Sequence, residues 1–250
     1  MKFSSKKNLS FLVIDQGNTL TKIALFKDNE LEWVRSFPEF GKEDADTLQL
    51  PFESIGGAII SSVSADPQRI TTLFDSLEWI ILEHDTSVPV KNNYHTPETL
   101  GKDRLAAVVA ANLIFPDNDV LVIDAGTAIT YDLITAHKEY IGGSISPGLT
   151  LRFKALHNFT QKLPLIETKP FYELTGFDTS SSILSGVMSG SIFEIDGFIS
   201  SYKEKYPNLK TILTGGDAIY FDKKLKSNIF AFPNLVLNGL NLILQHNLEK

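Results

Sequence analysis

The chain contains no cysteine and no long apolar run. Without cysteine, its 250 residues can form neither disulfides nor thiolate metal sites. The five histidines are scattered and show no metal-ligand spacing. No stretch approaches the ~20 apolar residues of a membrane span, and the first apolar run stops at Asp15, too early for the core of a signal peptide. We therefore expect a cytoplasmic protein with no membrane partner.

Positive charge is also scarce. Lys and Arg number 23 against 30 Asp and Glu, which gives a net charge of −7. This balance argues against a protein that works mainly by gripping nucleic-acid phosphates, so we expect no nucleic-acid partner. Hydrophobic residues make up 43% and charged residues 21% of the chain, as in globular proteins. The length suffices for one large domain or two of ordinary size.

The most informative stretch runs from Phe11 to Phe26. Four apolar residues predict a buried strand that ends in Asp15. Gly17 and Asn18 tolerate positive φ and indicate a tight turn before a second strand. The turn suits a nucleotide, because its amides and hydroxyls can hold phosphate oxygens while Asp15 holds Mg²⁺ directly or through water. A polar hairpin without a ligand would show the same pattern.

The chain repeats this pattern from Leu121 to Ile134, 109 residues later. An alignment without gaps matches Asp15 with Asp124, Gly17 with Gly126, Leu20 with Ile129 and Thr21 with Thr130. A repeat of this size predicts two similar half-domains that face each other, each with a phosphate-binding hairpin directed into a shared cleft.

Strands alternate with helices after the opening meander, which predicts an α/β fold with a mixed sheet in each half. We expect a flexible tail over residues 1–10, an N-terminal half over 11–118 and a C-terminal half over 119–250. Further strands are expected at 30–37, 57–63, 79–82, 120–124, 129–134, 139–141, 209–213 and 229–232. Helices are expected at 66–77, 101–115, 149–158, 179–206 and 235–248.

Four other motifs stand out, and the first three have two interpretations each. Asp103 opens an apolar helix, where it is either a dipole partner of the helix or a general base beside Arg104. The glycines of 142–148 suit close approach to a ligand or a tight connection. Residues 178–182 form a helix cap or offer hydroxyls to a polar ligand. The turn 214–217, Thr-Gly-Gly-Asp, can lie against an adenosine.

Together these motifs resemble those of type III pantothenate kinase. The resemblance rests on Asp-x-Gly-Asn-Thr (15–19), Leu-Gly-x-Asp-Arg (100–104), Asp-x-Gly-Thr-Ala-x-Thr (124–130), Gly-Gly-x-Ile-x-Pro-Gly-Leu (142–149) and Thr-Gly-Gly-Asp (214–217). It covers nearly the whole chain past residue 10. The second and fourth motifs are the specific ones, whereas the Asp-x-Gly hairpins are similar to those of actin-like and sugar-kinase-like ATPases in general.

The resemblance implies two duplicated ribonuclease-H-like half-domains with the active site in the cleft between them, and a homodimer. It implies ATP-dependent phosphorylation of pantothenate to 4'-phosphopantothenate, the first step of coenzyme A biosynthesis, with Mg²⁺ and with K⁺ or NH₄⁺. Asp103 would be the catalytic base and Asp124 the ligand of the monovalent cation. The residues implied for ATP are Asp15, Gln16, Gly17, Asn18, Thr19, Leu20, Thr21, Lys22 and Thr127. Those implied for pantothenate are Tyr94, Gly101, Lys102, Asp103, Arg104 and Thr179.

Two positions depart from the family pattern. Asp178 stands where the family usually has Asn, and Ser182 where it often has Ala; both lie beside Thr179. Two other functions stay open on the sequence: an ATP-binding regulatory or accessory protein of the same fold that does not turn over pantothenate, and a kinase of another small alcohol such as a sugar.

The composition of two helices also favours a homodimer. Residues 105–114 are apolar on nearly all sides, and the helix expected at 179–206 carries Gly186, Gly190 and Gly197. Both offer more surface for burial than one helix face needs. A thick core within one chain would give the same composition.

Overall fold

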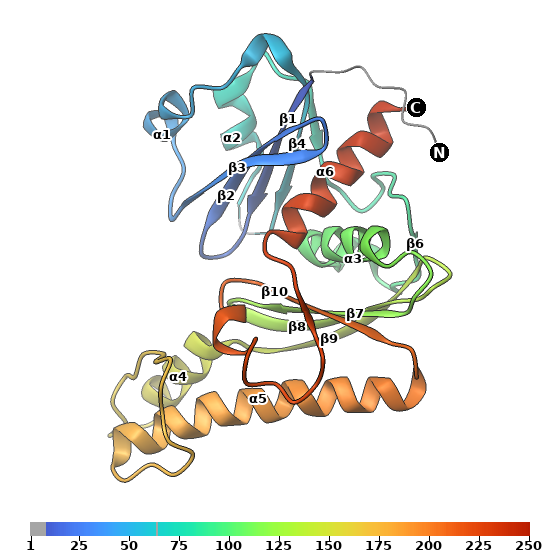
Figure 1. Cartoon of the computed structure of the whole chain (residues 1–250). Coiled ribbons are helices and arrows are strands. Elements are labelled where there is room, and N and C mark those ends of the chain that lie inside the picture. The colour runs from blue at the N-terminus through green and yellow to red at the C-terminus, as the bar shows by residue number, and fades with distance from the viewer. Residues whose placement is uncertain (1–8, 64) are drawn as a thin grey trace. The chain divides into compact units, whose positions relative to one another are not determined.

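The computed structural model describes residues 9–63 and 65–250. Most of the tail expected over residues 1–10 lies outside the described residues, and Ser10 already belongs to the first strand. The chain forms two compact units (Figure 1). Unit 1 comprises the described residues up to Leu113 together with Leu235–Lys250, and unit 2 comprises Ile114–Asn234.

Unit 1 is built on a mixed sheet with the strand order β3-β2-β1-β4-β5. Its strands are β1 (Ser10–Gln16), β2 (Thr21–Lys27), β3 (Glu30–Phe37), β4 (Ile55–Ser62) and β5 (Trp79–Ile81). β1, β2 and β3 pair antiparallel, whereas β4 is parallel to β1 and β5 to β4. Asp28 and Asn29 both have positive φ, 48° and 70°, as the two-residue turn between β2 and β3 requires.

The C-terminal helix belongs to unit 1. The helices of this unit are α1 (Lys42–Thr47), α2 (Gln68–Thr71), α3 (Lys102–Ile114) and α6 (Leu235–Leu248), and a two-residue strand, β6, spans Lys91–Asn92. α6 contacts β1 and β4. A Cβ on Gly239 of α6 would lie 1.8 Å from the carbonyl oxygen of Ala106 in α3. This close packing joins residues 235–248 to unit 1. The sequence predicted that these residues belong to the C-terminal half.

The helix expected at 66–77 is much shorter in the structure. α2 ends at Thr71 and gives way to a 3₁₀ turn over Thr72–Phe74. The hydroxyl of Thr72 donates a hydrogen bond to the carbonyl oxygen of Gln68 over 2.8 Å. Such local side-chain bonds compete with the regular ladder and make Thr a weak helix former. The predicted helix start at Asp66-Pro67 is close to the observed one, but the predicted end near residue 77 is wrong.

Unit 2 repeats the topology of unit 1. Its strands are β7 (Val120–Ala125), β8 (Ala128–Ile134), β9 (Glu139–Pro147), β10 (Lys210–Thr214) and β11 (Phe230–Ala231), in the order β11-β10-β7-β8-β9. β7, β8 and β9 pair antiparallel, while β10 runs parallel to both β7 and β11. The third, second, first, fourth and fifth strands thus follow one another in each unit. The duplication inferred from two short motifs extends to both sheets.

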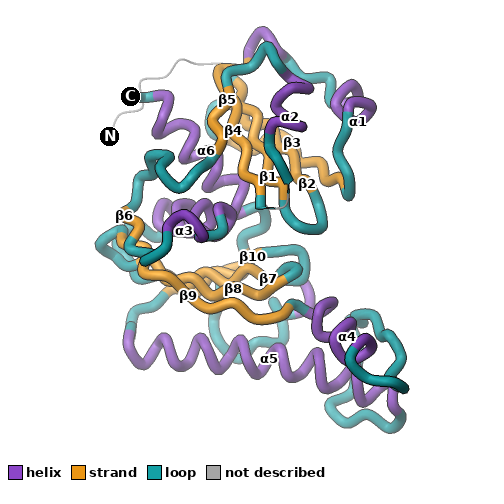
Figure 2. Tube along the Cα trace, turned by 180° about the vertical axis from the view of Figure 1, so that it is seen from behind, coloured by secondary structure: helices purple, strands orange, loops and turns teal. Residues whose placement is uncertain are grey.

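A long helix covers one face of the sheet of unit 2 (Figure 2). This helix, α5 (Thr179–Lys205), packs with α4 (Leu149–Asn158) and shares a buried core with β7 and β8. By length and composition α5 is the one helix in the described part of the chain that could cross a membrane, and 56% of its apolar window is buried. Its buried side chains, including Met188 and Ile195, make it a core helix of unit 2.

The glycine motif after residue 141 belongs to a strand. β9 was expected to end at Ile141 but continues to Pro147. Gly142 has a φ of +121° at a break in the register with β8, which identifies a β-bulge. A Cβ on Gly143 would lie 1.9 Å from the carbonyl oxygen of Tyr131. Close strand pairing therefore explains these two glycines without a ligand.

Candidate active site

The first hairpin turn lies between β1 and β2 and is open to solvent. The amide of Gly17 donates to the carbonyl oxygen of Leu20 over 3.1 Å, which closes the turn. Asn18, Thr19 and Leu20 are exposed. Gln16 is fixed from the neighbouring strand β4, because its side-chain oxygen accepts a hydrogen bond of 2.9 Å from the hydroxyl of Ser62. Residues 17–20 thus present amides and hydroxyls on a turn anchored at its base.

The second turn, between β7 and β8, is one residue shorter. In the first hairpin the last pair is Gln16 with Thr21, which leaves four residues in the turn. In the second hairpin the last pair is Ala125 with Ile129, which leaves three. The alignment without gaps is therefore wrong beyond the two glycines, and Thr21 is not the structural equivalent of Thr130.

The residue opposite each aspartate differs as a consequence. Lys22 lies opposite Asp15, and Thr130 lies opposite Asp124. Directly opposed residues of an antiparallel pair point to the same face of the sheet. The carboxylate of the first hairpin therefore shares its face with a cation, and that of the second with a hydroxyl.

The second turn is held by two segments that require glycine. The amide of Gly148 donates to the carbonyl oxygen of Thr127 over 3.0 Å, and that of Asp217 to the carbonyl oxygen of Ala125 over 2.8 Å. Gly215 has a φ of +95°, and a Cβ there would lie 2.4 Å from Oδ1 of Asp124. The motifs at 142–149 and 214–217 therefore meet at the turn 126–128.

Several oxygen atoms beside Asp124 are of the kind that binds hard cations. Oγ1 of Thr130, directly across from Asp124, is buried and makes no hydrogen bond to the described residues. Carboxylate, hydroxyl and carbonyl oxygens are the ligands of hard cations. Burial raises the pKa of the nearby Asp217 above its ordinary value. Residues 9–63 and 65–250 contain no group of three His, Cys, Asp or Glu side chains placed to hold a metal. A divalent ion would therefore need oxygens from its substrate, as Mg²⁺ in phosphoryl transfer does.

The start of α3 brings together four of the residues implied for pantothenate. The guanidinium of Arg104 lies 5.6 Å from the ring centre of Tyr94, in cation–π geometry. Oδ1 of Asp103 accepts a hydrogen bond from the amide of Arg104 over 2.8 Å. A Cβ on Gly101 would lie 2.6 Å from the same oxygen, so glycine leaves the space that this carboxylate occupies. Arg104 is only 6% exposed, which makes it an anchored cation rather than a solvated surface charge.

Lys102 is directed to a different partner. Its Nζ lies 2.9 Å from Oε1 of Glu83, and both side chains are partly exposed. The pair tethers the start of α3 to the segment after β5. Lys102 is therefore engaged in an ion pair with a residue outside the group implied for pantothenate.

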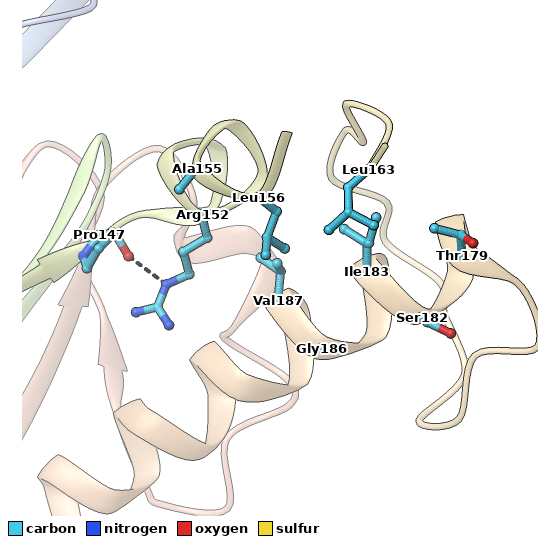
Figure 3. Close-up of a pocket in the computed structure, with 10 residues that line it drawn as sticks. All are labelled: Pro147, Arg152, Ala155, Leu156, Leu163, Thr179, Ser182, Ile183, Gly186 and Val187. Carbon is cyan, nitrogen blue, oxygen red and sulfur yellow. Dashed lines mark hydrogen bonds between the residues drawn. The ribbon is translucent and has the colours of Figure 1, made fainter. Parts of the chain in front are cut away.

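Thr179 lies in a separate pocket of unit 2, between α4 and α5 (Figure 3). The pocket has a volume of about 780 Å³ and is lined mainly by apolar side chains, with Arg152 at one end. Asp178 caps α5, because its carboxylate accepts a hydrogen bond of 2.7 Å from the amide of Ser181. This backbone hydrogen bond lowers the pKa of Asp178. The helix-cap interpretation of residues 178–182 is therefore confirmed for Asp178.

Sequence reasoning missed an ionic contact on the other side of this pocket. Arg152 of α4 and Glu194 of α5 form an ion pair with an N–O distance of 2.6 Å. A signal existed for each residue. Arg152 lies three residues beyond the Pro-Gly-Leu motif, and Glu194 is the first charged residue in a helix that is otherwise uncharged up to that point.

Comparison with known proteins identifies the relatives of this chain. The sequence model of the family "Type III pantothenate kinase" matches residues 11–201. A type III pantothenate kinase from Christiangramia forsetii is 47% identical over 239 residues, which cover 94% of this chain and 98% of the relative.

Solved structures agree on the fold. A Campylobacter jejuni protein assigned to the Baf family of transcriptional activators has a TM-score of 0.63 at 21% identity, covering 96% of this chain and 100% of that one. The ROK hexokinase of Thermus thermophilus has a TM-score of 0.50 at 12% identity, covering 94% and 98%. The fold is thus that of the actin-like and ROK sugar-kinase ATPases, and the chain belongs to the type III pantothenate kinase family.

Proposed function

We propose that this protein transfers the γ-phosphoryl group of ATP to pantothenate and forms 4'-phosphopantothenate in the cytoplasm, as the first step of coenzyme A biosynthesis. The observation that carries the proposal is the start of α3, where Gly101, Asp103, Arg104 and Tyr94 form one compact group. This group combines a carboxylate for a hydroxyl substrate with a buried cation for an anionic one.

Asp103 acts as the general base in this proposal. The transition state of phosphoryl transfer is loose, so the attacking hydroxyl becomes acidic late, and a carboxylate in hydrogen-bond reach can then accept its proton. The amide of Arg104 donates a hydrogen bond to one oxygen of the Asp103 carboxylate. This bond fixes the orientation of the whole carboxylate group. Arg104 and Tyr94 would hold pantothenate, with Gly101 and Lys102 beside it and Thr179 as a further contact.

The first hairpin binds the phosphates of ATP in this proposal. Residues 15–22 supply turn amides, the hydroxyl of the exposed Thr19 and the cation of Lys22, whereas the side chain of Thr21 is buried in β2. Asp15 would hold Mg²⁺ directly or through water, and the chemistry such an ion would supply is neutralisation of charge on the phosphates. Thr127 of the second turn contacts the nucleotide.

Asp124 anchors K⁺ or NH₄⁺ in this proposal. Thr130 places an orphaned hydroxyl oxygen opposite the carboxylate, where Lys22 stands in the first hairpin. A monovalent cation bound here supplies the positive charge that the second hairpin lacks.

The protein works as a homodimer in this proposal. Unit 2 exposes large apolar side chains on β9, on α5 and at and after the end of α4: Ile145, Phe159, Phe171, Leu174, Phe177 and Phe193. Gly186, Gly190 and Gly197 of α5 leave open space where a Cβ would be, as in helices that pack closely against a partner. A second copy would cover this apolar face. Light scattering should give a mass near twice 27.8 kDa; a mass near 27.8 kDa at micromolar concentration would contradict the dimer.

The function is tested by coupled ADP release with pantothenate and a panel of sugars. We expect turnover with pantothenate alone, and a loss of about 10²–10⁴-fold in Asp103→Asn while ATP still binds. Glu98→Gln is the matched control, because Glu98 is an exposed carboxylate five residues before Asp103 and has no role in this proposal. Turnover of a sugar instead of pantothenate would assign another kinase activity, and ATP binding without turnover of either would assign an accessory role.

A further inference from the structure

A cluster of four polar side chains joins four elements of unit 2. Arg152 of α4 donates to Oε2 of Glu194 over 2.6 Å. The other carboxylate oxygen, Oε1, accepts hydrogen bonds from the hydroxyl of Tyr131 in β8, over 2.9 Å, and from that of Ser146 in β9. Glu194 is therefore fully engaged by one cation and two hydroxyls, on a helix that is otherwise part of the apolar core.

This cluster is connected to the second hairpin turn through the backbone of β9. Nε of Arg152 donates to the carbonyl oxygen of Pro147 over 2.7 Å (Figure 3). The next residue, Gly148, donates its amide to the carbonyl oxygen of Thr127 over 3.0 Å. A Cβ on Gly148 would lie 2.1 Å from the carbonyl oxygen of Gly126. One peptide unit is thus held by Arg152 on one side and in direct contact with the turn on the other.

The charges in the cluster are stable at neutral pH. Burial alone would raise the pKa of Glu194, but hydrogen bonds from Ser146, Arg152 and Tyr131 together lower it. Burial, together with the neighbouring Glu194, raises the pKa of Tyr131, so the phenol stays a donor. The side chains of Arg152 and Glu194 are 21% and 25% exposed, so solvent screens the pair less than it screens a surface pair.

We infer that Arg152 and Glu194 are positioning residues for the turn Gly126–Thr127, which they fix through Pro147 and Gly148. The inference rests on the proposed role of Thr127 in nucleotide binding. The alternative is that this ion pair only tethers α4 to α5 and has no effect on the turn. The two roles differ in their consequence, because a tether changes stability alone, whereas a positioning pair changes the affinity for nucleotide specifically.

The test compares Glu194→Gln and Arg152→Met with Glu204→Gln, an exposed acidic residue on the same helix. For both test variants we expect KM for ATP to rise about tenfold with KM for pantothenate within twofold of wild type, since small misplacements of binding groups are costly. Arg152→Lys should restore part of the ATP affinity, and Glu204→Gln should match wild type. The double variant should be no worse than the singles, because either change breaks the same connection.

A second readout separates this inference from the proposed function. Titration of a fluorescent ATP analogue measures nucleotide affinity without turnover and should show the same tenfold loss. An unchanged nucleotide affinity with a lowered Tm would overturn the positioning role and leave a tether. A wild-type protein that binds the analogue but does not phosphorylate pantothenate would refute the proposed function and leave the positioning role testable. If Glu194→Gln fails to fold, Arg152→Lys and Glu194→Asp give the same comparison.

Discussion

The two hairpins carry the same Asp-x-Gly motif but differ in the length of the turn and in the residue opposite the aspartate. The turn after Asp15 is open and has four residues, and Lys22 lies opposite Asp15 on the neighbouring strand. The turn after Asp124 has three residues, and Thr130 lies opposite Asp124. A lysine therefore lies opposite the aspartate of the first hairpin, and a hydroxyl lies opposite that of the second.

The support of the two turns differs as well. The first is anchored at its base by the hydrogen bond from Ser62 to Gln16. The second is enclosed by Gly148 on one side and by Gly215 on the other, and Gly148 is backed by the pair of Arg152 and Glu194. Duplication preserved the topology of the sheets, whereas the surroundings of each turn diverged. The comparison predicts that the first turn is flexible and tolerates changes around it. It predicts that the second turn is rigid and loses its geometry when the segments packed against it are changed.

The largest expected effect comes from adding one methyl group beside each turn. In Gly148→Ala the new Cβ would lie 2.1 Å from a carbonyl oxygen of the second turn, so the turn must shift. We expect kcat/KM for ATP to fall by about 10²-fold. In Gly17→Ala the nearest atom is 3.3 Å away, and we expect a change of only a few-fold. Steady-state kinetics with varied ATP measure both.

Gly41→Ala serves as the control for Gly148→Ala. It adds a methyl group outside both turns, at a position where no atom lies within 4 Å of the new Cβ, so its ATP kinetics should stay near wild type. Equal losses in Gly17→Ala and Gly148→Ala would show that the two turns are supported alike and would break the comparison.

The next effect concerns the cations. Asp124→Asn should raise the K⁺ concentration for half-maximal activity by about tenfold, since it removes one charge-assisted contact worth on the order of 1.5–3 kcal/mol. Asp15→Asn should raise the Mg²⁺ requirement and leave the K⁺ curve in place. The measurement is pantothenate-dependent ADP release, with KCl added to a Na⁺ buffer that contains Mg²⁺–ATP. Two results would contradict the assignment of K⁺ to Asp124 and Mg²⁺ to Asp15. One is a wild-type rate that does not respond to KCl. The other is an equal rise, in both variants, of the K⁺ concentration for half-maximal activity.

The smallest expected effect is a difference in acid sensitivity. The pKa of Glu194 is lowered in the folded protein, so its ion pair stabilises the fold above the unfolded-state pKa, near 4.5, and this contribution is lost as the pH falls through the folded value. Glu194→Gln should therefore lower the free energy of unfolding by about 1 kcal/mol at pH 6, and by less as the pH falls below 4.5. Urea unfolding at several pH values measures this difference.

Ser62→Ala is the matched variant in unit 1, because it removes the neutral hydrogen bond to Gln16. Its effect on the free energy of unfolding should be the same at every pH. A pH-independent difference between Glu194→Gln and wild type would show that the ionic contact does not stabilise unit 2.

Much of the fold followed from local patterns. The helices at 149–158 and 235–248 have the predicted limits, since each combines a clear start with an uninterrupted apolar stripe. β9 was underestimated because Gly142 and Gly143, which usually end a strand, here form a bulge and a close contact with Tyr131. The association of α6 with unit 1 rests on its contacts with β1 and β4 and on the close approach of Gly239 to Ala106, all far apart in the sequence.

The site was predictable where a motif is local. The grouping of Tyr94 with Arg104 could be expected because ten residues separate them and a helix start fixes the second. The shorter second turn could not be expected, since a gap of one residue is invisible in a motif of four matches. Nor could the pairing of Arg152 with Glu194, because only the packing of α4 on α5 brings them together.

The most direct test of the central claim is identification of the product. Wild-type protein would be incubated with ATP, Mg²⁺, K⁺ and pantothenate, and the mixture analysed by mass spectrometry alongside ADP measurement. Our account predicts that phosphorylated pantothenate accumulates in a one-to-one ratio with ADP and that the Asp103→Asn variant forms almost none. Release of ADP without phosphorylated pantothenate would contradict it.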